Sequence, residues 1–228
     1  MQDSVEELVT DLAVIAKGFY ARGWLLGTSG NLSAVVKREP LELAVTASGV
    51  DKGQLIPKQV LMIDENARVL SEHSACESPG FIRSSDRSQC VYKPSDESFL
   101  HIRIVKQRGA GAVLHTHSVW NTILSEVHAS ERGIQIEGYE MLKGLDGVKT
   151  HQHSEWLPII ENSQDMHALS DTVSDVLERN PQAHGFLIKR HGLYSWGQDL
   201  AQAKRHIEIF EFLLETMGQT ATLKSRRS

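Results

Sequence analysis

Apolar side chains recur every three or four residues in several long segments of the chain, a spacing typical of amphipathic helices with one buried face. Residues 4–22 show the pattern clearly, with Leu8 and Leu12 on one face and Asp3 or Ser4 placed to cap the first turn. The predicted helices are residues 4–22, 96–108, 118–128, 165–179 and 199–217.

Shorter apolar runs rich in β-branched residues lie between these helices and predict strands. The predicted strands are residues 32–37, 41–46, 60–64, 67–70, 109–114, 134–136, 156–160, 186–190 and 193–196. Helices and short strands intermix without a repeating strand-helix unit. We therefore expect an α/β fold, an α/β/α sandwich with a mainly antiparallel central sheet flanked by helices. No internal repeat or linker divides the sequence, so we expect one domain over residues 1–228.

Composition and charge exclude several classes of protein. Of the 228 residues, 40% are hydrophobic and 23% are charged, as in an average globular protein. Lysine and arginine total 24 against 29 for aspartate and glutamate, and the net charge of -5 provides no general attraction for nucleic acid. No apolar run approaches the roughly 18 to 20 residues that cross a bilayer. Residues 1–7 are acidic where a secretory signal would be basic, so we expect a cytoplasmic protein without a nucleic-acid or membrane partner.

Residues 71–94 combine serine, proline, glycine and scattered charge without periodicity, which predicts a long surface loop. Both cysteines, Cys76 and Cys90, fall in this segment. Two cysteines cannot form a disulfide framework. We expect reduced thiols.

Histidine is the residue type that departs from the average, with 11 copies. His115 and His117 come at the end of the apolar run 109–114, and residues two apart on a strand point to the same face. Two imidazoles so placed can share a zinc ion, and a catalytic zinc site needs a third protein ligand with one position left open. His191 is the best candidate for that ligand, because it also follows an apolar strand and precedes a glycine.

The remaining histidines do not follow a rigid apolar strand of this kind. His151 and His153 have the same spacing but lie among polar residues, and we interpret them as part of a solvated loop. The others are expected at the surface or on helix faces: His73, His101, His128, His167, His184 and His206.

Two carboxylates are candidates for proton transfer beside a metal. Glu140 lies in a polar segment and Glu97 lies at a predicted helix start, where each is also compatible with an ordinary structural role. The turns at residues 29–31 and 48–49, and the helix start that Ser95 can cap, present hydroxyls and N–H groups to an anion. Such sequences also occur as plain turns.

Five short motifs follow one another along nearly the whole chain. They are Gly30-Asn31-Leu32-Ser33, Thr46-Ala47-Ser48-Gly49, Lys93-Pro94-Ser95-Asp96-Glu97, His115-Thr116-His117-Ser118 and Arg190-His191-Gly192. In this order they resemble the class II aldolase/adducin family. Four blocks, residues 109–118, 140–144, 158–162 and 190–197, are similar to the branch of that family that dehydrates 5-methylthioribulose 1-phosphate in methionine salvage.

The resemblance implies a class II aldolase-like fold, a phosphosugar substrate and a homotetramer with active sites near subunit boundaries. One Zn2+ per subunit would be bound by His115, His117 and His191. Glu140 would be the acid/base of dehydration, and Glu97 matches the glutamate next to the metal in aldolase members. The implied phosphate-binding residues are Asn31, Ser48, Gly49 and Ser95.

One position departs from the family pattern, and two other functions stay open. Aldolase members often have a second serine where this chain has Asp96, whose carboxylate would repel a phosphate, so Asp96 is left out of the phosphate site. One alternative is a sugar-phosphate aldolase or pentulose-phosphate 4-epimerase on the same scaffold. The other is a non-catalytic adducin-like module, although such a module has no physical need for three converging imidazoles.

Overall fold

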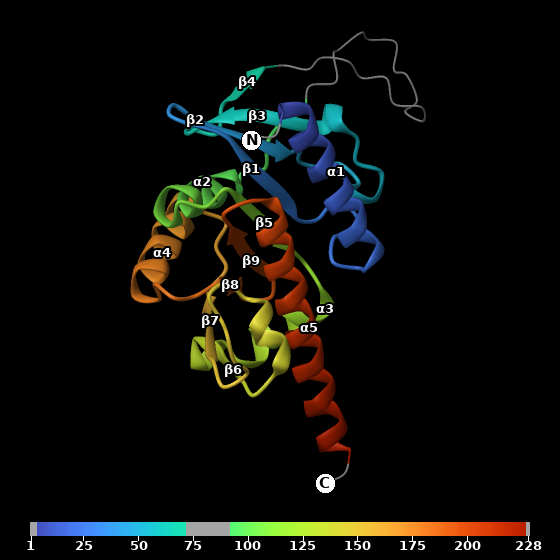
Figure 1. The fold of residues 1–228 in the computed structure, drawn as a ribbon, viewed down its shortest axis with the longest axis vertical. Helices are drawn as coiled ribbons and strands as arrows, with labels where there is room; N and C mark the ends of the chain where they lie inside the picture. The colour runs from blue at the N-terminus through green and yellow to red at the C-terminus, as the bar shows by residue number, and fades with distance from the viewer. Residues whose placement is uncertain (1–3, 72–91, 227–228) are drawn as a thin grey trace.

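The computed structural model describes residues 4–71 and 92–226 and has three layers, with helices on both faces of a sheet (Figure 1). The nine strands of these residues follow the order β4-β3-β2-β1-β5-β9-β8-β7-β6. Neighbouring strands are antiparallel except β7 and β8, which are parallel. The strands are β1 (Asn31–Arg38), β2 (Leu41–Thr46), β3 (Val60–Asp64), β4 (Val69–Ser71), β5 (Ala112–Thr116), β6 (Gly133–Glu137), β7 (Ser154–Ile160), β8 (Gly185–Ile188) and β9 (Gly192–Gly197).

The helices form two layers, with α1 and α3 in contact with α5, and α2 in contact with α4. Side chains that alternate along β5 point to one helix layer or the other. Thr116 donates to Glu211 of α5. Val113 points to the opposite face, and its partner on β1, Ser33, contacts His101 of α2. The helices are α1 (Val5–Ala21), α2 (Ser98–Arg108), α3 (Val119–Val127), α4 (Met166–Arg179) and α5 (Leu200–Ser225), with 3-10 turns η1 (Lys52–Gln54), η2 (Pro57–Gln59), η3 (Ala129–Glu131) and η4 (Glu140–Gly144).

Polar caps fix where most helices begin. Ser4 forms a capping box with Glu7 at the start of α1, and the Ser118 hydroxyl caps α3. The predicted cap of α2 by Ser95 was wrong, because the helix begins at Ser98 and the Ser95 hydroxyl instead accepts the N–H of Glu97 at 3.3 Å. Ser95 is thereby left at the entrance of the helix, facing the site described below.

The expected α/β/α sandwich with a mainly antiparallel sheet is confirmed. β5 is buried along its whole length, because helices cover both of its faces. The last helix is longer than predicted and ends at Ser225. Most of the predicted loop, including His73, Cys76 and Cys90, lies outside the described residues. Among the helices of the described ranges, none is long and apolar enough to cross a membrane.

Candidate active site

Three histidines lie at one end of the strands, where the parallel strands β5 and β8 both terminate. We call this end of the sheet the histidine edge, and the other end of the strands the opposite edge. β5 and β8 both pair antiparallel with β9, so their carboxyl ends lie at the same edge. His115 is in β5, His117 follows that strand, and His191 lies in the tight turn between β8 and β9. Arg190 in this turn has a φ of 54°, a left-handed conformation that is uncommon for a non-glycine residue and occurs at functional sites.

Ring nitrogens and one carboxylate converge at this edge. The Nε2 atom of His115 lies 2.7 Å from Nε2 of His117 and 3.4 Å from Nε2 of His191. The Oε1 atom of Glu97 lies 3.0 Å from Nε2 of His191 and 3.6 Å from Nε2 of His115. The four ligand atoms all lie within 4.8 Å of one another. The structure thus brings together the three predicted ligands and the glutamate expected beside them; we call this group the metal cluster.

The contacts around His115 prepare it to bind a cation. Its Nδ1 atom donates to the carbonyl of Leu193 at 2.9 Å, so the tautomer available to a metal carries its lone pair on Nε2. The ring also stacks on Tyr194, with ring centroids 3.8 Å apart. Tetrahedral zinc with Zn–N distances of about 2.0 to 2.1 Å separates its ligand nitrogens by about 3.3 Å. The 3.4 Å between His115 and His191 is close to this separation, and the 2.7 Å between His115 and His117 is shorter. Three imidazoles and a carboxylate are therefore a donor set that fits a divalent metal.

Two members of the metal cluster, Glu97 and His117, are held in the charge states in which they can bind a metal, a carboxylate and a neutral imidazole. Burial opposes ionisation of Glu97, but the charges and hydrogen bonds of His115 and His191 outweigh it and hold the pKa of Glu97 well below its usual range. Burial, followed by the charges of the neighbouring rings, lowers the pKa of His117 to about 2. The amide of Asn31 donates to Oε2 of Glu97 at 2.5 Å and orients the carboxylate.

Two glycines allow the backbone to approach these histidines closely. Gly30 has a φ of 68°, and a Cβ there would lie 2.7 Å from the backbone oxygen of His115. At Gly192 a Cβ would lie 2.2 Å from the backbone oxygen of Thr116 and 2.8 Å from Cε1 of His115. A side chain at either position would displace the end of β5, which explains a glycine in each of these two motifs.

A cavity of about 340 Å³ opens beside the metal cluster and is lined by Glu97 and His191. Two predicted phosphate residues, Ser48 and Ser95, also line it. Lys93 lines the same cavity and accepts the N–H of Ser48 at its backbone oxygen, at 2.9 Å. Hydroxyls and a lysine around one cavity suit a phosphate. Asp96, which was expected outside the phosphate site, lines the same cavity, and its carboxylate opposes an anion there. Lys93 belongs to the Lys93-Pro94-Ser95-Asp96-Glu97 motif, but nothing in the motif alone indicates that it lines the cavity.

The other two predicted phosphate residues are placed differently. Asn31 is 3% exposed and its amide is bonded to Glu97. Gly49, with a φ of 72°, lies in the turn next to Ser48. Asn31 therefore contacts the carboxylate of the metal cluster, and Gly49 shapes the turn that carries one of the cavity hydroxyls.

Lys52 is a buried cation that the sequence analysis missed. It is 1% exposed, and its Nζ atom donates to the carbonyls of Thr28, Ala47 and Val50 at 3.4, 3.4 and 3.1 Å. Burial lowers the pKa of Lys52 to about 8 against the opposing charges of two nearby carboxylates. Lys52 thus bonds to residues that flank both predicted anion-binding turns. Its sequence setting does not distinguish it from a surface lysine, because its carbonyl partners come together only in the fold.

Glu140 lies away from the metal cluster within its own chain. Ile160, the last residue of β7, pairs with β8 next to the histidine turn. β6 runs antiparallel to β7 and ends at Glu137, which pairs with Ser154 at the other end of β7. The length of β7 separates the two ends, about 20 Å at roughly 3.3 Å per residue. Glu140 is exposed there and pairs with Lys143.

Three other histidines, His101, His184 and His206, are more buried than their sequence setting indicates. His101 and His206 lie on the inner faces of their helices, at 0% and 2% exposure. The expected surface position of His184 was wrong, because its ring is bonded to the buried carboxylate of Glu155. His151 is exposed, as interpreted from sequence. His153 was interpreted as part of the same solvated loop, but its ring is partly buried and its Nε2 atom donates to the buried Glu155 at 2.8 Å.

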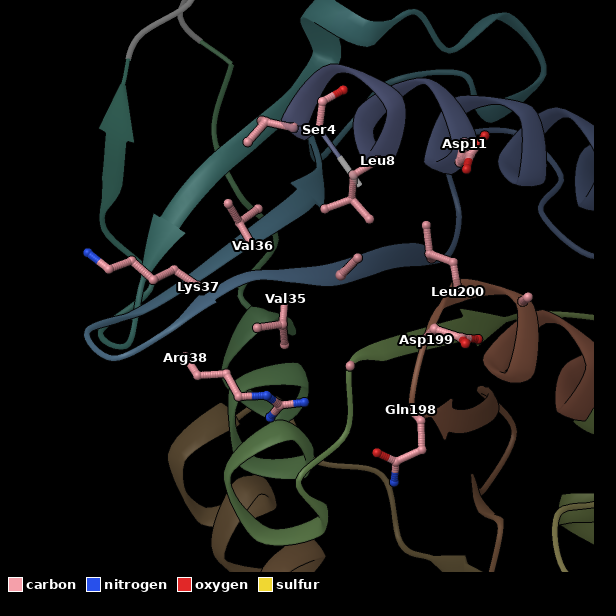
Figure 2. A pocket seen from close by; sticks show the side chains of 14 residues that line it. Ser4, Leu8, Asp11, Val35, Val36, Lys37, Arg38, Gln198, Asp199 and Leu200 are labelled. Carbon is pink, nitrogen blue, oxygen red and sulfur yellow. The ribbon is translucent and has the colours of Figure 1, made fainter. Parts of the chain in front are cut away.

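A second cavity, of about 890 Å³, opens at the opposite edge of the sheet (Figure 2). It lies between the start of α1, the end of β1 and the start of α5, and Leu8, Arg38 and Asp199 are among its lining residues. No member of the metal cluster lines it. We therefore place the candidate active site at the histidine edge.

The fold and the metal cluster define a class II aldolase-type protein, and comparison with known proteins agrees. The class II aldolase and adducin N-terminal domain family matches residues 10–217, and the chain belongs to this family.

Relatives within the family carry a more particular name. A protein of Marinobacter nauticus named methylthioribulose-1-phosphate dehydratase is 38% identical over 209 residues, which cover 91% of this chain and 90% of the relative. A protein of the same name from Persephonella marina is 35% identical over 223 residues, covering 98% of this chain and 94% of the relative. The similarity therefore extends over nearly the full length of both partners.

Solved structures share the fold at low sequence identity. The L-fuculose-1-phosphate aldolase of Thermus thermophilus superimposes with a TM-score of 0.71 at 17% identity, covering 97% of this chain and 99% of that chain. A sugar-phosphate aldolase of Thermotoga maritima gives a TM-score of 0.65 at 16% identity, covering 95% and 96%. These likenesses establish the class II aldolase-like architecture.

Proposed function

We propose that this chain is a zinc-dependent hydro-lyase of methionine salvage that converts 5-methylthioribulose 1-phosphate to 5-methylthio-2,3-dioxopentyl phosphate. The observation that carries the proposal is the nearly full-length similarity to proteins named for that reaction, in a chain whose metal-binding groups converge. One catalytic domain would form each subunit. A phosphorylated metabolite as substrate suits a cytoplasmic location.

The metal would be held by His115, His117 and His191. A bound zinc ion supplies Lewis-acid polarisation of the substrate carbonyl, which makes the hydrogen on the adjacent carbon easier to remove as a proton. Glu97 is the carboxylate of the metal cluster. It is ionised and oriented by Asn31, so it is placed to accept that proton.

Dehydration removes a proton from C3 and the hydroxyl group from C4 of the ketose. Glu140, in its acid form, protonates the departing hydroxyl so that it leaves as water. The enol that remains between C3 and C4 becomes a ketone at C3 when a proton is added at C4. C3 is oxidised while C4 is reduced, so the reaction needs no redox cofactor.

The phosphate would bind in the cavity beside the metal cluster. Ser48 and Ser95 offer hydroxyls there, Gly49 shapes the turn, and Lys93 supplies positive charge. Asn31 is the least direct of the predicted phosphate residues, because its amide is already bonded to Glu97. Anchoring the remote phosphate fixes the reacting carbons relative to the metal and the carboxylates.

Glu140 would act in the active site of a neighbouring subunit of a homotetramer. Its position about a strand length from its own metal cluster supports a role between chains rather than within one. A row of exposed apolar side chains supports association, because burying it between copies removes it from water. These side chains lie on α3 and on α5, which extends beyond the body of the fold: Val119, Ile123, Val127, Phe212 and Leu223.

Turnover of two substrates by the zinc-loaded protein tests the proposal. With 5-methylthioribulose 1-phosphate we expect the diketone phosphate, and with fuculose 1-phosphate we expect no cleavage. An aldolase would instead break a carbon–carbon bond of fuculose 1-phosphate to give an aldehyde and dihydroxyacetone phosphate, and a 4-epimerase would invert a pentulose phosphate. An adducin-like module would retain no metal and convert neither substrate. Any of these three results, without diketone formation, excludes the dehydratase.

A further inference from the structure

A second cluster of histidines around a carboxylate lies at the opposite edge of the sheet. Glu155 of β7 is 2% exposed and accepts hydrogen bonds from the backbone N–H of His184 at 3.0 Å, from Nδ1 of His184 at 3.0 Å and from Nε2 of His153 at 2.8 Å. His206 of α5 completes the cluster, with its ring centroid 5.3 Å from that of His184. We call these four residues the clamp cluster. None of them takes part in the proposed chemistry.

Two of these rings hold both backbone groups of Asp146. Nε2 of His184 donates to the Asp146 carbonyl at 2.9 Å, and Nε2 of His206 accepts the Asp146 N–H at 3.1 Å. Nδ1 of His206 donates to the carbonyl of Trp196 at 2.7 Å. Because both nitrogens of His184 face oxygen acceptors, its ring is an imidazolium, whereas His206 has one donor and one acceptor and is neutral.

The charged groups around His184 agree with this assignment. Burial alone would lower the pKa of His184, but the hydrogen bond and charge of Glu155 outweigh it and raise the pKa above its ordinary value. Burial, reinforced by the charge of His184, lowers the pKa of His206 to about 4. The groups that face His184 are thus Glu155 from β7, Asp146 from the loop after η4 and His206 from α5, while His153 faces Glu155.

Asp146 ends the segment that carries Glu140, which lies six positions earlier in the chain. Between them, Leu142 and Leu145 are buried, at 0% and 2% exposure. Gly144 lies so close to α5 that a Cβ there would come within 2.3 Å of a side-chain carbon. The segment is therefore packed on α5 in its middle and held by its backbone at its end.

We propose that His184, held by Glu155, is a positioning residue that fixes Asp146 and thereby the Glu140 carboxylate presented to a neighbouring active site. This inference rests on the proposed acid/base role of Glu140. Because an error of about 1 Å in a reacting group can cost about 100-fold in rate, a hydrogen bond six residues from the carboxylate influences catalysis without touching substrate.

The variant His184→Asn keeps an amide donor near the Nδ1 position and loses the bond to Asp146. We expect kcat to fall about 10- to 100-fold, with KM and zinc content little changed because the metal cluster and the phosphate cavity lie at the other edge. His184→Gln, whose longer amide can donate to Asp146, should recover part of this loss. The matched control is His128→Asn, which breaks a surface histidine–glutamate pair of 2.9 Å and should leave kcat unchanged.

Two further measurements separate positioning from general destabilisation. Wild-type kcat should decline as pH rises through the raised pKa of His184, and this decline should be missing in His184→Gln because an amide does not titrate. Adding His184→Asn to Glu140→Gln should cause no further loss of kcat, since the two residues act through one carboxylate. If His184→Asn lowered kcat by the same factor in wild type and in Glu140→Gln, the proposal would be overturned.

Hydrogen exchange of residues 140–146 tests the clamp without reference to activity. We expect faster exchange in His184→Asn than in wild type, and unchanged exchange would refute the clamp. Faster exchange with unchanged kcat would refute its catalytic role. If Glu140→Gln itself were fully active, the proposed acid/base assignment would fail, and the catalytic part of this proposal with it.

Discussion

Two clusters of histidine and glutamate lie at opposite edges of the same sheet, and the same residue types behave differently in them. In the metal cluster, Nε2 atoms of His115 and His117 face each other at 2.7 Å, and the orienting hydrogen bond is made at the other nitrogen of His115. In the clamp cluster, both ring nitrogens of His184 and His206 are bonded to other protein groups. Converging lone pairs are available to a cation, whereas satisfied nitrogens hold backbone in place.

The glutamates differ in the same way. Glu97 lines a cavity, and its carboxylate lies among rings that also face one another. Glu155 is buried, and its oxygens are taken up by His153 and His184. Residue type and burial are therefore poor guides to chemistry, and the partners of each nitrogen and oxygen are the better criterion.

The largest effect is expected from a substitution that breaks the metal cluster. His117→Ala should lose bound zinc and lose turnover by more than the roughly 10- to 100-fold typical of removing an outer-shell partner, measured by elemental analysis and a product assay. The matched change His153→Ala in the clamp cluster should retain zinc. Full activity in a metal-free His117→Ala protein would contradict the mechanism.

The next effect concerns the carboxylate that the clamp cluster is proposed to position. Glu140→Gln should retain zinc and lower kcat by about 100- to 10,000-fold, the range for removal of a general acid or base. Glu97→Gln is the informative comparison. If Glu140→Gln dehydrates normally while Glu97→Gln is inactive, the two carboxylates must exchange their proposed roles.

Breaking the clamp cluster should cost stability rather than metal. Glu155→Gln removes the partner of a partly buried imidazolium. Breaking a fully buried pair typically costs about 3 to 5 kcal/mol in the free energy of unfolding, which is the upper bound here. The pKa of Glu155 is lowered by His184 against the effect of burial, so its contribution is present above its unfolded pKa of 4.5 and is lost as pH falls through the folded value. The contribution of His184 is present below its unfolded pKa of 6.5 and is lost as pH rises through its raised folded value.

Denaturant unfolding across pH measures this contribution. The difference in the free energy of unfolding between wild type and Glu155→Gln should be largest between about pH 4.5 and 6.5, where Glu155 and His184 are both charged. The difference should become smaller at lower and at higher pH. A difference that is constant with pH would mean that the two groups are not an ion pair in solution.

The smallest effect lies behind the metal cluster, at Glu211. Burial raises its pKa to about 7, although hydrogen bonds from Ser118, Thr116 and Asn121 oppose the shift. With an unfolded pKa of 4.5, the protonated form favours folding at low pH, and this contribution is lost as pH rises through 7. Relative to Glu211→Gln, the free energy of unfolding of wild type should therefore fall by up to about 3 kcal/mol as pH rises from 4.5 to 7. Unfolding midpoints with the same pH slope in both proteins would contradict this.

Much of the fold could be read from the sequence, because local patterns depend on nearby residues. The apolar run before His115 predicted a buried strand, and its alternation placed His115 and His117 together. The hydroxyl of Ser118 predicted the start of α3. Ser95 was misplaced as a cap because its competing bond to the Glu97 N–H depends on how the loop enters the helix.

The sequence by itself determined the layered α/β architecture, the strand that carries the first two histidines and, through ordered motifs, the family. Only the tertiary structure decided which charged and imidazole groups meet, because β5, β8 and α2 come together through strand pairing and helix packing between distant segments. The same long-range packing buried Lys52, bonded His184 to Glu155 and placed Glu140 at the edge opposite the metal cluster. The local sequence around each residue does not indicate how far it lies from residues in distant segments.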